Sequence, residues 1–253
     1  MTALRDDALL ERYDLRHEEV AESLFSYLER RLPTANVLSL RTQRRMVQPI
    51  NDLISGCFYP GQGLECARSG PDHKFGPALK SAVTWLDTSE RSGRQQTPAK
   101  VGSGCFNRLE CELISARLNA LNKQFARRDK DRVRPRVTVA VITGYADQRA
   151  KLEQTLNPRS PRWSHIEILL NTVDAFQGRQ ADMVIYSVTR SNPFAKLGFL
   201  KEAPRLNVAL SRGRDALLIV GDKEFCRGIH GDNPFRDVIR WIEKADGCET
   251  ETA

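Results

Sequence analysis

Three arginines beside predicted elements are the residues of this sequence whose type and placement best suit chemistry. Arg45 follows a predicted strand at residues 37–40, and Arg212 and Arg214 stand in a short turn. A guanidinium fork matches the oxygens of a phosphoryl group, and an arginine that reaches a transferring phosphoryl group can raise its rate roughly 10³–10⁵-fold. That is about 4–7 kcal/mol of barrier. Solvated or paired surface arginines have the same appearance, so the residues alone leave both interpretations open.

A phosphate-binding loop is missing from the sequence. The nearest string runs from Gly76 to Ser81, but it has Leu79 where the glycine before the lysine belongs and Lys74 where the first glycine belongs. Its backbone amides therefore cannot wrap a phosphate. Asp222 follows an apolar run as a magnesium-binding acid would, yet single acids after strands are common. By itself, the chain lacks the parts that hold a nucleoside triphosphate and its metal.

Composition and charge narrow the class of protein. Of the 253 residues, 40% are hydrophobic, which suffices for a core and excludes wholesale disorder. There are 39 Lys and Arg against 32 Asp and Glu, a formal charge of +7 and a pI near 9.2. Basic proteins of this kind suit nucleic acid, because Lys and Arg neutralise phosphates, although many use their charge only for solubility.

Cysteine usage and the N-terminal sequence bear on location and metal binding. The six cysteines form no Cys-x-x-Cys pair and the four histidines are scattered, so we expect reduced thiols and no metal site. The first ten residues, MTALRDDALL, carry two acids where a signal peptide needs basic residues, and the apolar runs are too short for a membrane span. We therefore expect a cytoplasmic protein without a membrane partner.

Hydrophobic periodicity indicates which elements position these residues. Near-continuous apolar strands alternate with helices, which predicts an α/β, doubly wound parallel sheet with helices on both faces. Helices are expected at 7–31, 49–55, 107–125, 146–156, 207–210 and 236–244, and strands at 37–40, 82–86, 137–142, 166–170, 183–188 and 216–220. We expect a helical lead-in at 1–31, the main domain at 32–228 with a loop-rich part at 60–104, and a C-terminal helix and tail at 229–253. Ligands of such sheets lie beyond the carboxyl ends of the strands.

Several ordered segments resemble a known family. The segments 171–192 and 205–214 look like motifs V and VI of superfamily 1 helicases, in the branch of the nonsense-mediated-decay RNA helicase and its bacterial and archaeal relatives. Residues 43–46, Gln-Arg-Arg-Met, resemble the Gln-Tyr-Arg-Met signature of motif IV, and residues 139–148 resemble the Ile-Thr-Pro-Tyr-x-x-Gln element. That family's motor has two RecA-like domains with ATP between them. The resemblance implies a RecA-like, P-loop-NTPase-type fold and only the second domain, which lacks the P-loop.

The resemblance also implies roles for individual positions. Arg45 and Arg212 correspond to the two arginines that reach the γ-phosphate, and Gly178 to a glycine whose backbone approaches it. Asp174 and Gln177 correspond to residues that couple the two sites, although turn capping explains them equally well. The remaining matches are Gln43, Arg44 and Gln180 on the nucleotide side, and Thr143, Tyr145, Thr172 and Arg190 on the nucleic-acid side.

Some positions depart from the family pattern or have two interpretations. Arg44 replaces the tyrosine that stacks on the adenine, and Gln180 replaces a glutamate. The basic run at 127–136 could follow a nucleic-acid strand, but a solvated loop is the simpler interpretation. Trp85 and Phe176 could stack on bases, and for Trp85 core packing is favoured.

Two functions from different classes remain open at this stage. The first is the C-terminal motor half of an ATP-dependent 5′-to-3′ helicase, with ATP and Mg²⁺ held mainly by a P-loop-bearing first domain. Its partners would be that domain and single-stranded nucleic acid. The alternative is a stand-alone module that binds nucleic acid or a partner and hydrolyses nothing. In either case we expect the chain alone to be inactive as an ATP hydrolase.

Overall fold

The computed structural model describes residues 28, 31–99, 104–128 and 135–253. The chain forms two compact units, Met1–Leu40 and Arg41–Ala253. In the first unit, the described residues include a short 3₁₀ helix, η1, at Thr34–Asn36. The helix predicted at 7–31 lies almost wholly outside the described residues. The strand predicted at 37–40 is wrong: these residues have no regular structure and pair with no strand of the sheets.

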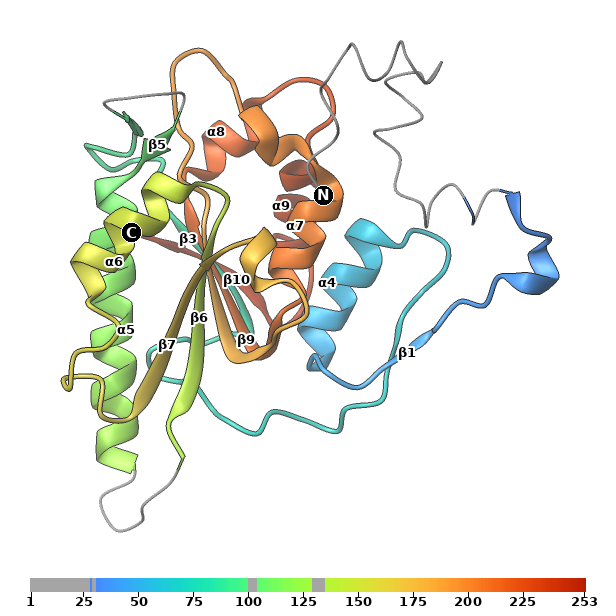
Figure 1. The fold of residues 1–253 in the computed structure, drawn as a ribbon, viewed down its shortest axis with the longest axis horizontal. Helices are drawn as coiled ribbons and strands as arrows, with labels where there is room; N and C mark the ends of the chain where they lie inside the picture. Colours follow the sequence, from blue (N-terminus) through green and yellow to red (C-terminus); the bar gives the residue numbers. More distant parts are fainter. Residues whose placement is uncertain (1–27, 29–30, 100–103, 129–134) are drawn as a thin grey trace, which may run out of the picture. The chain divides into compact units, whose positions relative to one another are not determined.

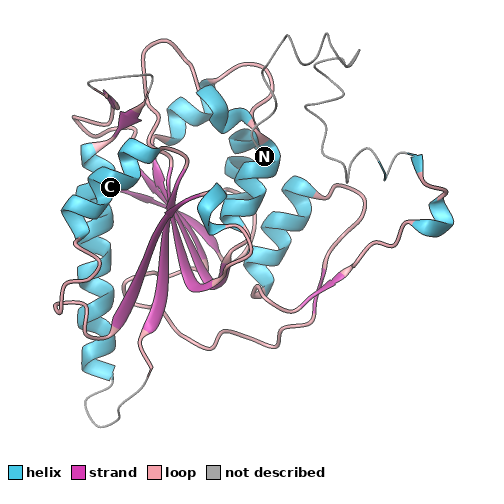
Figure 2. Ribbon diagram, in the orientation of Figure 1, coloured by secondary structure: helices cyan, strands magenta, loops and turns pink. Residues whose placement is uncertain are grey.

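A six-stranded, fully parallel sheet forms the centre of the second unit (Figure 2). This confirms the predicted α/β fold class. The strand order is β10 (Cys248–Thr252), β3 (Val83–Asp87), β9 (Gly213–Gly221), β8 (Ala181–Ser187), β6 (Val137–Thr143) and β7 (Ile166–Thr172). Strand β8 is buried at all of its positions, as expected for a parallel strand covered on both faces.

Helices cover both faces of this sheet (Figure 1). One face carries α5 (Arg108–Arg128) and α6 (Ala146–Leu156), which pack on a core that includes Ile114, Leu118 and Leu152. The other face carries α4 (Gln48–Phe58), α7 (Ala203–Leu210) and α9 (Pro234–Ile242), around Ile50 and Phe235. Helix α8 (Lys223–Gly228) follows β9. The residues that connect these helices to the strands therefore lie where the strands begin or end. Below, the amino edge is the side of the sheet where the strands begin, and the carboxyl edge is the side where they end.

The tail beyond residue 228 is part of this architecture. Its predicted helix is α9, and after it the edge strand β10 pairs in parallel with β3. The sequence Cys-Glu-Thr-Glu-Thr has no apolar run, so periodicity could not reveal it. An edge strand tolerates such charged residues because only one side pairs with the sheet.

Four further strands of two residues each form small ladders outside the central sheet. Strand β1 (Thr42–Gln43) pairs in parallel with β2 (Glu65–Cys66), and β4 (Thr97–Pro98) pairs antiparallel with β5 (Cys105–Phe106). Arg45 follows β1, so its expected position after a strand of the central sheet is wrong. The chain around Arg45 is fixed to that sheet by the Val47 amide, which donates to the Arg214 carbonyl at 2.9 Å.

The burial of individual side chains settles two expectations. Trp85 and Phe176 are fully buried, so both belong to the core rather than to a surface where bases could stack. All six cysteines are free in the structure. In the described part of the chain, no helix is both long enough and apolar enough to cross a membrane.

Candidate functional site

The predicted site residues gather at opposite edges of the sheet. The carboxyl edge is formed by the last residues of the strands, including Thr143, Thr172 and Ser187. The amino edge is formed by their first residues, including Ala181 and Gly213, which are partners in register. The predicted nucleic-acid residues lie at the carboxyl edge, and the predicted phosphate-binding arginines lie at the amino edge.

Arg212 stands at the amino edge because it directly precedes β9. Its carbonyl accepts from the Ala181 amide at 3.1 Å, and its Nε donates to the Val208 carbonyl of α7 at 2.8 Å. Arg45 reaches the same place from the other side, where its Nη1 donates to the Ser211 carbonyl at 3.0 Å. Within the described residues, neither guanidinium forms an ion pair with a carboxylate.

Among the described residues, no acidic group compensates the charges of these two arginines. Burial, and next the neighbouring Arg45, lower the pKa of Arg212 from its ordinary value, against a smaller opposing effect of Tyr59. Two cations that share a half-buried position without an acid favour an external anion, because a buried charge is costly unless it is paired. The donor set therefore fits a phosphate group.

The turn before Arg45 is held by Gln43. Its Oε1 accepts from the amides of Arg45 at 2.9 Å and Met46 at 2.8 Å, and its Nε2 donates to the Met46 carbonyl at 3.0 Å. Gln43 thus closes the turn that presents Arg45, whereas Arg44 between them is exposed. Its guanidinium is free to face a ligand from the surface.

Residues 173–180 join the carboxyl edge to the amino edge. They leave β7 at Thr172, form the 3₁₀ helix η2 (Asp174–Phe176) and enter β8 at Ala181. Phe176 packs in the core on the face of α4 and α7, while Gln177 and Gln180 are exposed. This single connection therefore passes from the predicted nucleic-acid side to the predicted nucleotide side.

Gly178 gives this connection its shape. Its φ is +83°, in the left-handed region that residues other than glycine rarely adopt, and an added Cβ would meet nothing within 4 Å. The glycine is therefore required by the backbone conformation and leaves open space beside it. Its backbone is accessible to a ligand.

Asp174 ties this connection to helix α7. Its carboxylate forms an ion pair with Arg205, and the Arg205 Nε donates to Asp174 Oδ1 at 3.2 Å. The hydrogen bond to Asp174 is the main cause that raises the pKa of Arg205. Helix α7 ends just before Arg212. The Asp174–Arg205 pair is consequently a contact between the connection and the element that carries Arg212.

At the carboxyl edge, Arg190 and Tyr145 form one unit. The Arg190 Nε donates to the Tyr145 hydroxyl at 2.6 Å, and the guanidinium carbon lies 4.9 Å from the centre of the Tyr145 ring. The same hydroxyl donates to the Leu197 carbonyl at 3.2 Å. Tyr145 is buried, whereas Arg190 is half-buried. The Arg190 guanidinium is therefore the charged group that this pair exposes at the surface.

The two predicted threonines differ in accessibility. Thr143 is fully buried, and its hydroxyl lies 3.0 Å from that of Thr189. Thr172, its partner in register on β7, is half-buried. The structure thus brings Thr143, Thr172, Tyr145 and Arg190 to one edge, but the Thr143 hydroxyl is occupied within the protein.

Glu110, a buried acid of this edge, carries no predicted role. Glu110 accepts from the Thr189 amide at 2.9 Å and from the Ser187 hydroxyl at 2.5 Å, and burial raises its pKa to about 8 although both bonds oppose the shift. Asn107 and Gln148 join the same network, in which Gln148 Oε1 accepts from the Asn107 amide at 2.7 Å. A sequence signal exists, because Glu110 is a charged residue on the buried stripe of α5 and Asn107 directly precedes that helix.

This network holds an unusual backbone. Thr189 has φ +70°, a conformation that costs about 1–3 kcal/mol for a β-branched residue and persists only where surrounding contacts fix it. The amide bonded to Glu110 is that of Thr189 itself, which directly precedes Arg190. Glu110 therefore fixes the turn from which Arg190 projects.

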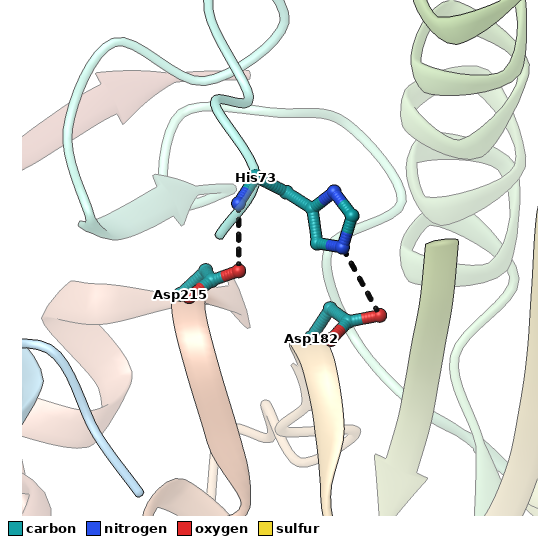
Figure 3. Close-up of side chains that lie close together, drawn as sticks. All are labelled: His73, Asp182 and Asp215. Carbon is teal, nitrogen blue, oxygen red and sulfur yellow. Dashed lines mark hydrogen bonds and ion pairs between the residues drawn. The ribbon is translucent and has the colours of Figure 1, made fainter. Parts of the chain in front are cut away.

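A third cluster, His73, Asp182 and Asp215, lies at the amino edge and is the only metal-like grouping in the described ranges (Figure 3). The His73 amide donates to Asp215 Oδ2 at 3.0 Å, and its Nε2 lies 3.8 Å from Asp182 Oδ2. Both acids already have cationic partners, since Asp215 pairs with Arg68 and Asp182 with Arg214 at 3.4 Å. The pairs that Arg68 and His73 form with these acids connect the 66–75 segment to the sheet.

Comparisons with known proteins bear on this arrangement. The family model described as "AAA domain" matches residues 20–224. The ATP-dependent helicase NAM7 of Saccharomyces cerevisiae is 32% identical over 209 residues, which cover 78% of this chain and 20% of that protein. A regulator of nonsense transcripts 1 homolog of Drosophila melanogaster is 36% identical and covers 72% of this chain and 15% of that protein.

One further relative and one solved structure are also similar to this chain. The DNA polymerase alpha-associated DNA helicase A of Saccharomyces cerevisiae is 37% identical over 236 residues, which cover 88% of this chain and 33% of that protein. The chain thus spans between about a seventh and a third of the length of these relatives. A solved structure, the C-terminal domain of a possible DNA helicase from Lactobacillus plantarum, aligns with a TM-score of 0.43 at 14% identity and covers 82% of this chain and 98% of that one.

Proposed function

The chain belongs to the AAA domain family, in the nonsense-mediated-decay branch of the superfamily 1 helicases, and from this premise we propose that it works as the C-terminal motor half of an ATP-dependent 5′-to-3′ DNA or RNA helicase. One observation carries the proposal. Arg45 and Arg212 share the amino edge without an acidic partner among the described residues, although each is held in place by backbone carbonyls. Two positioned but uncompensated guanidinium groups suit a phosphate group.

ATP binding is divided between this chain and a P-loop-bearing first domain. ATP, when bound, would supply the γ-phosphoryl group that is transferred to water with ADP as the leaving group, and Arg45 and Arg212 would hold the oxygens of that phosphoryl group. The exposed Gly178 backbone, the Gln43 turn, Arg44 and Gln180 lie on the nucleotide side. Mg²⁺ belongs to the first domain, because the described acids nearest the amino edge are already paired with Arg68 and Arg214.

Single-stranded nucleic acid binds at the carboxyl edge. Arg190 offers a charge there, and Thr172 offers a half-buried hydroxyl. Contacts of this kind hold phosphates without reading sequence. We therefore expect weak, sequence-independent binding that falls steeply with salt.

The 173–180 connection transmits between the two sites. It begins at Thr172 on the carboxyl edge and ends at the amino edge beside Arg212, and Asp174 fastens it to α7. A shift of the connection on strand binding would therefore displace the elements that present the arginines. Gln177, exposed within it, is placed to contact a partner across the cleft.

The alternative function is a module that binds nucleic acid and hydrolyses nothing. The absence of a P-loop in these 253 residues and the charge of +7 favour it. The two functions differ in one measurement. We would supply a P-loop-bearing first domain from a relative of the same branch and measure ATP hydrolysis with and without single-stranded RNA or DNA.

We expect the 253-residue chain alone to hydrolyse ATP at background rate, and the mixture to show hydrolysis stimulated by nucleic acid. The first domain alone is the control. If the mixture is no faster than the first domain alone while the two proteins co-elute, the motor assignment fails and the binding module remains.

A further inference from the structure

A groove with a basic lining lies on the α5 face of the sheet, away from both proposed sites. Its volume is about 950 Å³, near the upper end of the roughly 300–1,000 Å³ range of ligand pockets. The lining comes from the 74–78 segment and from the last two turns of α5. It consists of Lys74, Gly76, Pro77, Ala78, Ala120, Lys123, Gln124, Arg127 and Arg128.

The lining is uniformly positive. Lys74, Lys123, Arg127 and Arg128 contribute four cations, and no acidic residue among those described lines the groove. None of the four has an ion pair within the described ranges, in contrast to Arg68, Arg117 and seven other arginines of this unit. Four unpaired cations around one groove attract a polyanion.

Helix periodicity explains why these cations share a face. Lys123 and Arg127 are four residues apart, as are Gln124 and Arg128, so these side chains project from one side of α5. The opposite side of the same turns holds Leu121 and Phe125 in the core. The cations also lie at the carboxyl end of the helix, where its dipole stabilises positive charge.

The groove is held open by contacts of its other wall. Phe75 and Leu79 anchor the 74–78 segment in the core, and Gln124 accepts from the Ala78 amide at 3.1 Å and donates to the Lys74 carbonyl at 3.2 Å. The distance between wall and helix is thus fixed before any ligand arrives. A preformed site loses less entropy on binding.

The groove is separate from the carboxyl edge. Helix α5 begins at that edge, where Glu110 bonds to Thr189, and Arg127 lies 17 residues further along. At 1.5 Å per residue, these two positions are about 25 Å apart. Arg45 and Arg212 contact α7 and the turn before β9, which belong to the other face of the sheet.

We propose that this groove binds the phosphate backbone of nucleic acid, as a second contact outside the motor site. The described lining residues include no aromatic side chain, so they offer bases no stacking surface and the contact is independent of sequence. The proposal rests on the proposed function for the nature of the partner. It adds a grip on the part of the strand or duplex that lies beyond the carboxyl edge.

The test compares two double variants of the full chain with equal loss of charge. Lys123→Gln with Arg127→Gln removes two groove cations that are four residues apart. Arg240→Gln with Lys244→Gln removes an exposed arginine and lysine at the same spacing on and after α9, which covers the other sheet face. Binding of a labelled 30-nucleotide single strand is measured by anisotropy over a range of salt concentrations.

We expect the groove variant to reduce the slope of log affinity against log salt by about 1.4, since each phosphate contact to a single strand contributes about 0.7. At 0.1 M salt the affinity falls on the order of tenfold. The α9 variant should leave the slope unchanged. Equal changes in both variants, or none in either, overturn the proposal.

Two further measurements separate this proposal from others. If the groove variant loses binding to polyglutamate but keeps its binding to the oligonucleotide, the groove takes an acidic protein and the proposal is wrong. Arg190→Gln tests the carboxyl edge independently. If only Arg190→Gln loses binding, the groove proposal is wrong and the proposed function stands. If only the groove variant loses binding, the groove proposal stands and the proposed contact at the carboxyl edge is wrong.

Discussion

The two edges of the sheet handle their polar groups in opposite ways. At the carboxyl edge, Glu110, Ser187, Thr189 and Gln148 satisfy one another in a buried network without a cation. At the amino edge, charged groups dominate. Asp182 and Asp215 each form an ion pair with an arginine, whereas Arg45 and Arg212 have no acidic partner among the described residues.

This difference indicates what each edge needs from outside. The carboxyl edge is complete as folded, and it presents Arg190 from a turn that its own network fixes. At the amino edge, Arg45 and Arg212 have no negatively charged partner among the described residues, and a phosphate would supply that negative charge. Substitutions at the carboxyl edge should therefore change stability, and those at the amino edge should change activity.

The largest effect is expected for Arg212→Ala in the presence of a first domain. Turnover should fall on the order of 10³-fold or more, because an arginine at a transferring phosphoryl group is worth roughly 10³–10⁵ in rate. Arg212→Lys should not restore it, since an ammonium lacks the planar fork. Arg45→Ala should behave in the same way. The measurement is the ATPase rate of the mixture.

Stability and nucleic-acid binding should be almost unchanged in these variants. Arg240→Ala, at an exposed position on α9, is the control for loss of an arginine. An Arg212→Ala mixture that hydrolyses ATP at the unaltered rate would make Arg212 a surface arginine. It would also remove the contrast between the edges.

The next effect is on stability at the carboxyl edge. Glu110→Ala leaves the Ser187 hydroxyl and the Thr189 amide without their acceptor in a buried place. Such losses cost about 1–3 kcal/mol for each unsatisfied group, so we expect the free energy of unfolding to fall by about 3 kcal/mol. Urea denaturation measures it. A loss as small as that of an exposed substitution would contradict the assigned network.

The same residue gives a pH dependence with a defined sign. The pKa of Glu110 is about 8 in the folded protein, above its ordinary value of 4.5, so the folded state holds a proton that the unfolded state releases. Its contribution is fully present below pH 4.5 and is lost as the pH rises toward 8. Between pH 6 and 8 this amounts to about 2 kcal/mol.

Glu110→Gln isolates this effect, because the amide stays neutral at both pH values. We expect the free energy of unfolding of the natural chain to decrease from pH 6 to pH 8 relative to that of Glu110→Gln. Parallel pH profiles for the two proteins would show that Glu110 is ionised in the folded state. The network would then contain a charge, like the amino edge.

Apolar runs in the sequence predicted some strands of the sheet but not others. Long apolar runs predicted β6, β7, β8 and β9, since a doubly covered parallel strand must be apolar throughout. The apolar string at 37–40 looked similar but has no partner strand, and β10 is polar because it lies at an edge.

The site, like the strands, could be predicted only where the sequence carries a local signal. The resemblance to helicase motifs selected Arg45, Arg212, Tyr145 and Arg190, and the structure places them in two pairs. It did not indicate that the Thr143 hydroxyl is consumed within the protein or that Glu110 fixes the turn before Arg190. Those facts depend on contacts between residues about 45 and 80 positions apart, which no local pattern contains.

A smaller effect is expected in the connection between the edges. Gly178→Ala places a Cβ in open space at φ +83°, so only backbone strain of about 1–2 kcal/mol opposes it. Gly61→Ala is the matched control, because Gly61 has φ +79° and equally open surroundings. Both should lose similar stability in urea denaturation. If a phosphate approaches the Gly178 backbone, only Gly178→Ala should also slow the ATPase of the mixture.

The smallest effect on stability is expected for Asp174→Asn, which breaks the contact between the connection and α7. The two side chains are 64% and 35% exposed, and pairs this accessible to water contribute about 0.2–1 kcal/mol. Stability, basal ATP hydrolysis and strand binding should therefore stay nearly constant. If the pair carries the shift from one edge to the other, the stimulation of hydrolysis by nucleic acid should fall several-fold.

Glu202→Gln is the control for this last change, because Glu202 faces the same Arg205 at 3.7 Å but from helix α7's own N-terminus. It removes a carboxylate near Arg205 without touching the connection. Loss of stimulation in Asp174→Asn alone assigns the coupling to the link between the edges. Equal losses in both variants would instead trace the effect to the charge around Arg205, and unchanged stimulation in both would mean that the two edges communicate by another route.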